Sequence, residues 1–529
     1  MTERAAAALG RPSTQHQEGR DMPAFRDIFS GAAPFGAVRS VVAPGGGIGG
    51  GTEPAVTYPT RSGTLAFEPN GYPTDKTLRH LQEEIDYQRA VQAYIHYLPA
   101  VAVMQWRNAH FGPLGGGGGD LIVYRTTEQK LPILAADGAT TFVVGFAELA
   151  ETDGVLVYNV PSGPTAGAVL DIWQRPVSET GTAGPDAGRG GRFLIVLDGT
   201  EVPEDHGADF VIASKTSTIM VATRILTSDP QESERVLKAH RIHALGAQPA
   251  ARIFEAPNSD WSGHQPRGLD YWIVVHQILQ LNPLDERDMA VLQWLKNVGL
   301  EKGRAFEPTA TEENVLEEAA FVGEAWAMGN SFLERAPARD RPNEPVSQWQ
   351  DMVSVQSPLD QMAGTHMEID ARAADAYRAI PVATARPIAM DDAGTRYLTA
   401  YKDSAGRWLD GAKTYELVMY PDGSAPAFWA VVLYDNDTRC MIENAQGKTE
   451  VNSRQQLVAD EDGAVRLVFG PARPDGVPAA NWIQTNPEKG FFAHLRLHAP
   501  AAPFVDRSWR IGSIEEATSP FTTAYGAGQ

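Results

Sequence analysis

The sequence predicts an α+β protein of several domains, in which a β-sandwich, a helical module and a second β-sandwich or jelly roll follow one another. The chain has 529 residues, too many for a single hydrophobic core. Strand-like β-branched runs fill residues 120–225, helical periodicity fills 226–335, and strand-like runs return from about residue 395. These changes of pattern divide the chain into residues 1–70, 71–225, 226–345 and 346–529.

Residues 1–70 are rich in Gly, Pro, Ala and Ser, a composition typical of an extension rather than of a packed domain. Gly45, Gly47 and Gly50 satisfy the pattern G-x-G-x-x-G. The sequence that follows, "TEPAVTYP", does not open a helix, so the pattern lacks the context that dinucleotide binding needs. We expect no cofactor and no metal.

A long helix opens the next segment, in "PTDKTLRHLQEEIDYQRAVQAYIHYLP". Thr74 or Asp75 caps its start, and apolar side chains recur at helical spacing as far as Tyr97. We expect Pro99 to end this helix, because proline lacks the amide hydrogen that continues the helical ladder. Short strand-like runs divided by Gly, Pro, Asp and Asn then predict a small β-sandwich.

Four helical runs follow: "DPQESERVLKAHRIHAL", "LDYWIVVHQILQL", "DERDMAVLQWLKNVGL" and "TEENVLEEAAFVGEAWAMGNSFLERA". Acidic residues and Thr near their starts are suited to capping. We expect His240 and His243, in "HRIH", on a helix surface. Runs such as "KTYELVMY", "AFWAVVLYD" and "FFAHLRLHA" then alternate with turns and predict the second sandwich.

The composition narrows the class of partner. A formal net charge of −21 argues against nucleic acid or an anionic membrane, because both attract positive surfaces. The single cysteine, Cys440, excludes an intrachain disulfide. No apolar run approaches the roughly 20 residues of a membrane span, and no secretory signal is recognisable, so we expect a cytoplasmic protein. The sequence leaves open whether the protein forms a homo-oligomer.

Three blocks of the sequence carry a resemblance: "GYPTDKTLRHLQEEIDYQRAVQAYIHYLP", "VYNVPSGPTAGAVLDIWQRPVSETGTAGPDAGRGGRFLIV" and "GRWLDGAKTYELVMYPDGSAPAFWAVVLYDNDTR". With them, the chain resembles bacterial proteins that carry two domains of unknown function, numbered 1254 and 1214. The resemblance assigns residues 71–225 to the first domain and 346–529 to the second. It implies an immunoglobulin-like β-sandwich, a helical module and a jelly-roll-like β-sandwich. It implies no particular reaction, and such relatives are often exported.

The strand run "HLRLH" supplies the first candidate site. Side chains alternate along a strand, so His494, Arg496 and His498 share one face. The two histidines lie about 13 Å apart, at a rise of ~3.3 Å per residue, which is too far for one zinc ion. We expect a polar pocket wall in which Arg496 binds a carboxylate or a sugar hydroxyl and a histidine acts as general acid–base. A solvated sheet face is the alternative. The resemblance places His498 where relatives usually have Tyr.

Carboxylates in the first sandwich supply the second candidate. Asp171 and Trp173 in "VLDIWQ" would project from one strand face, where an indole beside a carboxylate suits a sugar-like ligand. Two carboxylates from Asp137, Glu148 and Asp171 could form a general acid–base pair, and the resemblance places Asp137 where relatives usually have Asn. The alternative is that these carboxylates are turn and strand-end residues.

Two further side chains join the predicted substrate-binding set. Arg192 belongs to the stretch "GPDAGRGGRF", whose glycines suit tight turns and whose arginines could lie at a pocket mouth and meet an anionic ligand. Asn481 belongs to a polar and aromatic group of the C-terminal sandwich. The predicted site therefore comprises catalytic Asp137, Asp171 and His498, and substrate-binding Trp173, Arg192, Arg496, His494 and Asn481.

The sequence leaves two functions open. The first is a cofactor-free hydrolase or lyase acting on a small organic or sugar-like substrate where the domains meet, since domain junctions often hold pockets. The second is a non-catalytic carbohydrate-binding, envelope-binding or structural protein. The sequence contains no G-x-S-x-G motif and no P-loop motif. Their absence argues against a serine hydrolase of the α/β type and against a P-loop nucleotide-binding protein.

Overall fold

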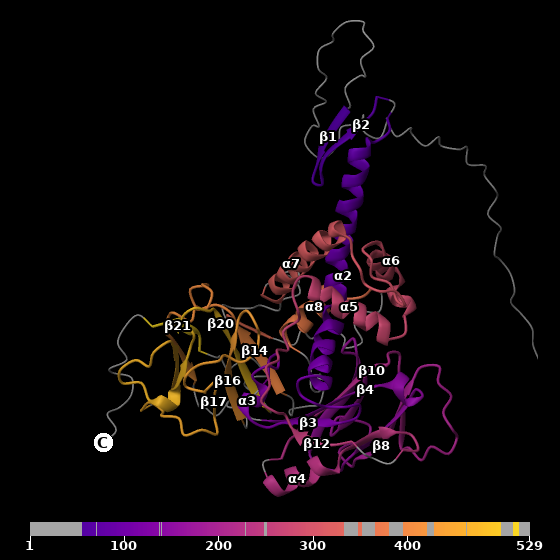
Figure 1. The fold of residues 1–529 in the computed structure, drawn as a ribbon. Helices are drawn as coiled ribbons and strands as arrows, with labels where there is room; N and C mark the ends of the chain where they lie inside the picture. Colours follow the sequence, from indigo (N-terminus) through magenta and orange to yellow (C-terminus); the bar gives the residue numbers. More distant parts are fainter. Residues whose placement is uncertain are drawn as a thin grey trace, which may run out of the picture. The chain divides into compact units, whose positions relative to one another are not determined.

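A computed structural model describes residues 56–69, 71–136, 138, 140–227, 229–247, 251–332, 348–351, 366–379, 395–419, 428–461, 463–498 and 512–517. The chain falls into two compact units, Met1–Ile85 and Asp86–Gln529. The Gly45–Gly50 pattern and Asp137 lie outside the described residues. The fold is α+β with several sheets, as the sequence predicted (Figure 1).

In the first unit, β1 (Val56–Thr60) and β2 (Gly63–Phe67) form an antiparallel hairpin. The long helix α2 (Asp75–Phe111) begins beside it. The Thr77 hydroxyl accepts a hydrogen bond from the amide of Ala66, at 2.8 Å, and so ties the hairpin to the first turn of the helix.

Helix α2 continues through Pro99, and the prediction that this proline ends the helix was wrong. The side chains from Ala93 to Met104 are almost completely buried, with Leu98, Ala100 and Val101 at 0 % exposure. The carbonyl of Pro99 accepts a hydrogen bond from Gln174 Nε2 at 3.0 Å. Burial of this apolar segment outweighs the loss of one backbone hydrogen bond at the proline.

The first β region consists of two sheets. The six-stranded sheet has the order β12-β3-β4-β10-β6-β7 and the four-stranded sheet the order β11-β5-β8-β9. The strands are β3 (Leu121–Tyr124), β4 (Thr141–Glu148), β5 (Val155–Val160), β6 (Thr165–Asp171), β7 (Pro176–Gly181), β8 (Gly191–Leu197), β9 (Phe210–Ser214), β10 (Thr218–Ile225), β11 (Arg241–Ala244) and β12 (Ile253–Glu255).

Alternation along the strands explains how these sheets pack. Val143 on β4 and Val221 on β10 face Phe193 and Ile195 of the other sheet in one apolar core. Their neighbours on the opposite face, among them Val144, pack in the same core cluster as buried residues of α2. The six-stranded sheet is therefore covered on both faces.

The predicted helices are present: α4 (Pro230–Ala239), α5 (Leu269–Leu281), α6 (Met289–Asn297) and α7 (Ala310–Phe332). A further helix, α8 (Ile369–Arg378), packs on α7. Figure 1 shows α5, α6, α7 and α8 gathered around α2. Within the described residues, no helix has both the length and the apolar character required to cross a membrane.

The expectation for "HRIH" was wrong. Helix α4 ends at Ala239, so His240 is its C-cap and His243 lies on strand β11. His240 is fully buried and its Nδ1 lies 3.0 Å from the hydroxyl of Tyr158 on β5. Pairing of β11 with β5 and burial of Ile242 in the sheet core override the local helical spacing.

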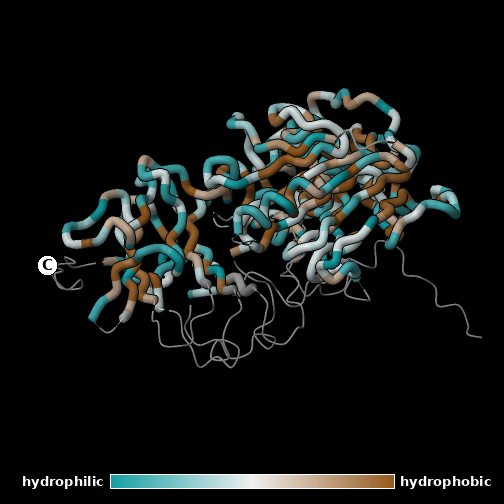
Figure 2. The backbone as a smooth tube through the Cα atoms, turned by 90° about the horizontal axis from the view of Figure 1, so that it is seen from below, coloured by the Kyte–Doolittle hydropathy of each residue, from teal (hydrophilic) through white to brown (hydrophobic). Residues whose placement is uncertain are grey.

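The C-terminal β region also has two sheets, in the orders β13-β14-β20-β16-β17 and β19-β18-β15-β21. The strands are β13 (Trp349–Asp351), β14 (Thr395–Ala400), β15 (Tyr415–Met419), β16 (Phe428–Asp435), β17 (Glu450–Asn452), β18 (Val465–Gly470), β19 (Trp482–Gln484), β20 (Phe491–His498) and β21 (Ile514–Glu516). Figure 2 shows the hydrophobic strands of both β regions between hydrophilic loops.

Candidate functional site

A cleft of about 480 Å³ lies between the first β region and the C-terminal β region. One wall comes from Glu128, on the short helix α3 (Thr127–Lys130), from Leu131 and Pro132, and from residues 258–262. The other wall comes from residues of the 435–443 and 486–491 segments. We call this hollow the junction cleft.

The lining of the junction cleft is acidic and partly aromatic. Glu128, Asp260 and Glu443 line it, while Lys489 is already bound to Asp435 at 2.6 Å. Trp261 and Phe491 add ring surface to the lining. Carboxylates accept hydrogen bonds from hydroxyl or amine groups, so this cleft is suited to a neutral or cationic polar ligand rather than to an anion.

Arg496 and Tyr434 hold the two walls of the cleft together. Arg496 Nη2 donates to the carbonyls of Ala135 and Ala136, at 2.6 and 3.0 Å, and to the Tyr434 hydroxyl at 2.7 Å. The Tyr434 hydroxyl donates to the Ala136 carbonyl in turn. In this structure Arg496 therefore binds backbone carbonyls, which positions the loop beside the cleft, and its predicted role as a substrate anchor stays a prediction.

Cys440 lies in the wall of the cleft and pairs as a β-bridge with Leu134. Its thiol donates to the carbonyl of Pro132 at 3.3 Å. Burial raises the pKa of this thiol to about 12. Since the thiolate is the nucleophile, the protonated thiol of Cys440 is a poor nucleophile at neutral pH.

The polar face of β20 is turned toward the body of the protein. Leu495 and Leu497 pack in the core between the two C-terminal sheets, whereas His494 on the alternate face lies 4.6 Å from the ring of Tyr434. Burial, together with Arg496 and Arg378, lowers the pKa of His494 well below its usual range, so its ring is neutral. The side chain of His498, like Asp137, lies outside the described residues.

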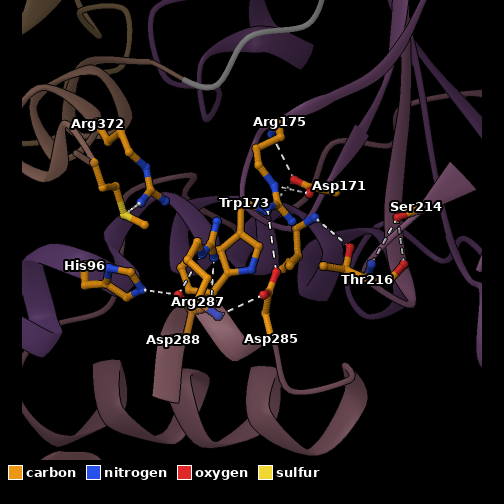
Figure 3. A network of polar contacts seen from close by, with 12 residues as sticks. His96, Asp171, Trp173, Arg175, Ser214, Thr216, Asp285, Arg287, Asp288 and Arg372 are labelled. Carbon is orange, nitrogen blue, oxygen red and sulfur yellow. Dashed lines mark hydrogen bonds and ion pairs between the residues drawn. The ribbon is translucent and has the colours of Figure 1, made fainter. Parts of the chain in front are cut away.

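Asp171 and Trp173 do not share a strand face, because β6 ends at Asp171 and Trp173 lies in the following turn. The Asp171 carboxylate accepts hydrogen bonds from the backbone amides of Trp173 and Arg175, both at 2.9 Å, and from Arg175 Nε at 2.6 Å (Figure 3). Asp171 thus closes a turn, which agrees with the alternative that the sequence left open.

Trp173 is enclosed by side chains of the protein and is only 5 % exposed. The guanidinium groups of Arg287 and Arg372 lie 4.8 and 5.6 Å from the centre of its ring. The rings of His96 and Tyr97 lie 5.1 and 5.0 Å away. The hollow beside Trp173 has a volume of about 20 Å³, which leaves no room for a sugar to stack on the indole.

The cluster around Trp173 contains an imidazole–carboxylate pair that the sequence did not reveal. His96 Nε2 lies 3.0 Å from Asp288 Oδ1, and Arg287 binds both oxygens of Asp288 at 2.8 Å (Figure 3). Burial disfavours ionisation of Asp288, but the hydrogen bonds from His96 and Arg287 outweigh it and hold its pKa below its usual range. Burial lowers the pKa of His96, and His96 Nδ1 has no hydrogen-bond partner.

Arg372, on α8, adds a further positive charge to this cluster, and we call it the surplus cation because the nearby carboxylates are paired with other arginines. Its side chain is buried, and its Nη1 contacts the sulfur of Met367 at 2.8 Å. Its Nε and Nη2 have no hydrogen-bond partner. The carboxylates nearby are already bound to Arg175 and Arg287. Burying a polar or charged group of this kind costs free energy of folding unless the group is paired.

The remaining predicted residues lie elsewhere. Arg192 is on β8, where its amide donates to Asp209 at 2.8 Å. Asn481 is completely buried; its side chain accepts from the amide of Val458 and donates to the carbonyls of Val458 and Arg466. These bonds give Asn481 a structural role, and none of the hydrogen bonds just described joins Arg192 or Asn481 to Asp171.

Comparison with known proteins confirms the resemblance. The family model DUF1254, described as a protein of unknown function, matches residues 124–246, and DUF1214, described in the same words, matches residues 394–502. The chain carries both domains, in the predicted order. No curated protein matches the chain.

The solved structures that resemble this chain are only distantly similar to it. The VPA0106 protein from Vibrio parahaemolyticus is 15% identical, with a TM-score of 0.46 over 82% of this chain and 100% of that chain. An uncharacterized protein from Burkholderia cenocepacia is 11% identical, with a TM-score of 0.34 over 83% of this chain and 96% of that chain.

Proposed function

We propose that the protein binds a small, polar, sugar-like molecule in the junction cleft. The observation that carries this proposal is the cleft itself, which has a volume of about 480 Å³ and takes its walls from both β regions. Small-molecule sites in proteins occupy roughly 300–1,000 Å³ and are common where domains meet. We also propose that the two β regions are an immunoglobulin-like and a jelly-roll-like sandwich, since each pairs two facing sheets.

The lining supports a ligand rich in hydroxyl groups. The carboxylates of Glu128, Asp260 and Glu443 accept hydrogen bonds, and the rings of Trp261 and Phe491 offer apolar surface for the C–H face of a sugar. Formal negative charges outnumber the single lysine of the lining. Carboxylate or phosphate ligands are therefore disfavoured at this site.

A second candidate function, a cofactor-free hydrolase or lyase, is favoured by the His96–Asp288 pair. A neutral imidazole oriented by a carboxylate is the usual arrangement of a general base. Here Asp288 holds Nε2 and leaves Nδ1 of His96 without a partner. The pair lies beside Trp173 rather than in the cleft, and the hollow there is small, so binding is the function that the geometry favours.

A ligand screen separates the two candidates. We expect thermal stabilisation by mono- and disaccharides or amino sugars, which is lost when Trp261→Ala removes ring surface from the cleft. His96→Gln serves as the matched variant outside the cleft and should leave binding intact. Formation of product that depends on His96 would instead support the enzyme. Stabilisation that survives Trp261→Ala and Glu443→Gln would show that the junction cleft is not the site.

A further inference from the structure

The charged side chains that line the junction cleft do not balance one another. They are four carboxylates and one ammonium group, with a formal balance of −3: Glu128, Asp260, Asp435, Glu443 and Lys489. Asp435 and Lys489 neutralise each other across 2.6 Å. Within the residues that the structure describes, the other three carboxylates form no hydrogen bond and no ion pair. These three carboxylates therefore remain available to a ligand in the cleft.

The three available carboxylates come from both walls of the cleft. Glu128, on α3, and Asp260, in the segment before α5, belong to one wall. Glu443, in the segment between β16 and β17, belongs to the other wall. All three residues are exposed to solvent, so their charges are hydrated while the cleft is empty. A ligand in the cleft thus meets negative charge from two sides.

The arginines near the cleft bind other groups. Arg439 follows the lining residues of its wall in sequence and precedes Cys440, but it does not line the cleft. Its Nη2 donates to Gln265 Oε1 at 2.5 Å. Arg267 is bound to Asp437 at 2.7 Å, and neither of these two residues lines the cleft. Lys489 is therefore the one basic side chain among the described residues of the lining.

Trp261 adds a ring that is suited to a cation. Its indole lines the cleft and stacks on Trp106, with the ring centres 6.2 Å apart. Trp106 is 1 % exposed, and its Nε1 donates to the hydroxyl of Tyr124 at 3.0 Å. This buried stack holds Trp261 in place in the wall. Among aromatic side chains, indole attracts ammonium groups most strongly, through the negative face of its ring.

We infer that the junction cleft selects ligands that carry a protonated amine, and that it prefers an amino sugar to a neutral sugar of the same size. The inference rests on the sugar-like ligand proposed for this cleft and names the charge of that ligand. An ammonium group donates three hydrogen bonds and is attracted by the lining of −3. A neutral sugar gains hydrogen bonds without that attraction, and a sugar acid is repelled.

The test measures binding of three sugars to the full-length chain by titration calorimetry at pH 6. Glucosamine carries a protonated amine, glucose has a hydroxyl group in its place, and glucuronate carries a negative charge. We expect glucosamine to bind at least tenfold more tightly than glucose, and glucuronate not to bind. Added salt should reduce the difference between glucosamine and glucose, because it screens exposed charges.

Two substitutions in the lining identify the carboxylates that create the preference. Glu128→Gln and Asp260→Asn each remove one charge but keep an oxygen acceptor. Each should lower glucosamine affinity about fivefold and leave glucose affinity unchanged, because only the ammonium group interacts with that charge. Glu313→Gln removes an exposed carboxylate of α7 outside the cleft, and this control should bind both sugars like the wild type.

The amine preference and the sugar site fail in different ways. Equal affinity for glucose and glucosamine, lost in Trp261→Ala, would overturn the amine preference and leave the sugar site in place. Absence of binding by all three probes would overturn the sugar site and the amine preference with it. A preference for glucosamine that persists unchanged in both Glu128→Gln and Asp260→Asn would also overturn the inference, because these carboxylates would then not create it.

Discussion

Replacing Asp288 by asparagine tests the electrostatics of the Trp173 cluster. Asp288 binds Arg287 through two hydrogen bonds of 2.8 Å and His96 through one of 3.0 Å, and it is 3 % exposed. Asparagine keeps the shape but removes the charge. Arg287 and Arg372 then both lie against the Trp173 ring with one carboxylate fewer nearby. The variant should be strongly destabilised.

The magnitude follows from the cost of a broken buried ion pair, about 3–5 kcal/mol. Asparagine retains one acceptor, so we expect about 3 kcal/mol. Unfolding entropy is about 2.1 cal/mol/K per residue, so for a chain of this length unfolding as one unit the midpoint falls by about 3 °C. If a smaller part of the chain unfolds as a cooperative unit, the midpoint of thermal unfolding should fall by more than this.

Calorimetry at pH 7 measures this change, and Asp285→Asn is the matched control. The side chain of Asp285 is 21 % exposed, caps the amide of Arg287 and lies 4.0 Å from Arg175, so its loss should cost about 1 kcal/mol or less. Arg372→Met, which removes the surplus cation, should restore part of the stability of Asp288→Asn.

The dependence on pH gives a second readout. The folded protein holds the pKa of Asp288 below its usual value of 3.8, so its stabilisation is complete above that pH and is lost as the pH falls below it. The difference between the wild type and Asp288→Asn should therefore shrink in acid. An unchanged midpoint at pH 7 for Asp288→Asn, or no rescue by Arg372→Met, would refute this account of the cluster.

Three further outcomes are expected. Cys440 should react with a thiol reagent at pH 8 only as fast as the chain unfolds, because burial raises its pKa to about 12; rapid labelling of the native protein would contradict this. Burial lowers the pKa of His240 to about 3, so stability should fall as the pH drops from 6.5 toward 3, and His240→Leu should flatten that decline in acid unfolding curves. Arg496→Met should weaken sugar binding in the junction cleft, measured by calorimetry, because it releases the carbonyls of Ala135 and Ala136; Arg192→Met should not.

Several features of the fold could be predicted because local patterns fix them. Short strand-like runs such as "FLIVL" and "FFAHLRLHA" became β8 and β20, and the four helical runs became α4 to α7. The alternation in "HLRLH" correctly separated Leu495 and Leu497 from His494 and Arg496. "HRIH" misled the helical prediction because sheet pairing of β11 outweighs local spacing.

The candidate sites depended on long-range contacts. The sequence drew attention to Asp171 and Trp173, but it could not show that Asp171 closes a turn or that His96, 75 residues before Asp171 in the chain, lies against the indole. Arg439 carried no signal in the sequence, because its burial depends on segments that are distant in the chain, such as that of Gln265.

The sequence by itself determined the succession of strand-rich and helix-rich stretches, the two domains of unknown function and the acidic character of the chain, because propensity, periodicity and charge are local or additive. Only the tertiary structure decided which polar groups are satisfied. Arg496 donates to backbone carbonyls, whereas Nε and Nη2 of the buried Arg372 have no hydrogen-bond partner among the described residues. A side chain's partner is set by segments that meet in space, and that meeting depends on how the sheets and helices pack.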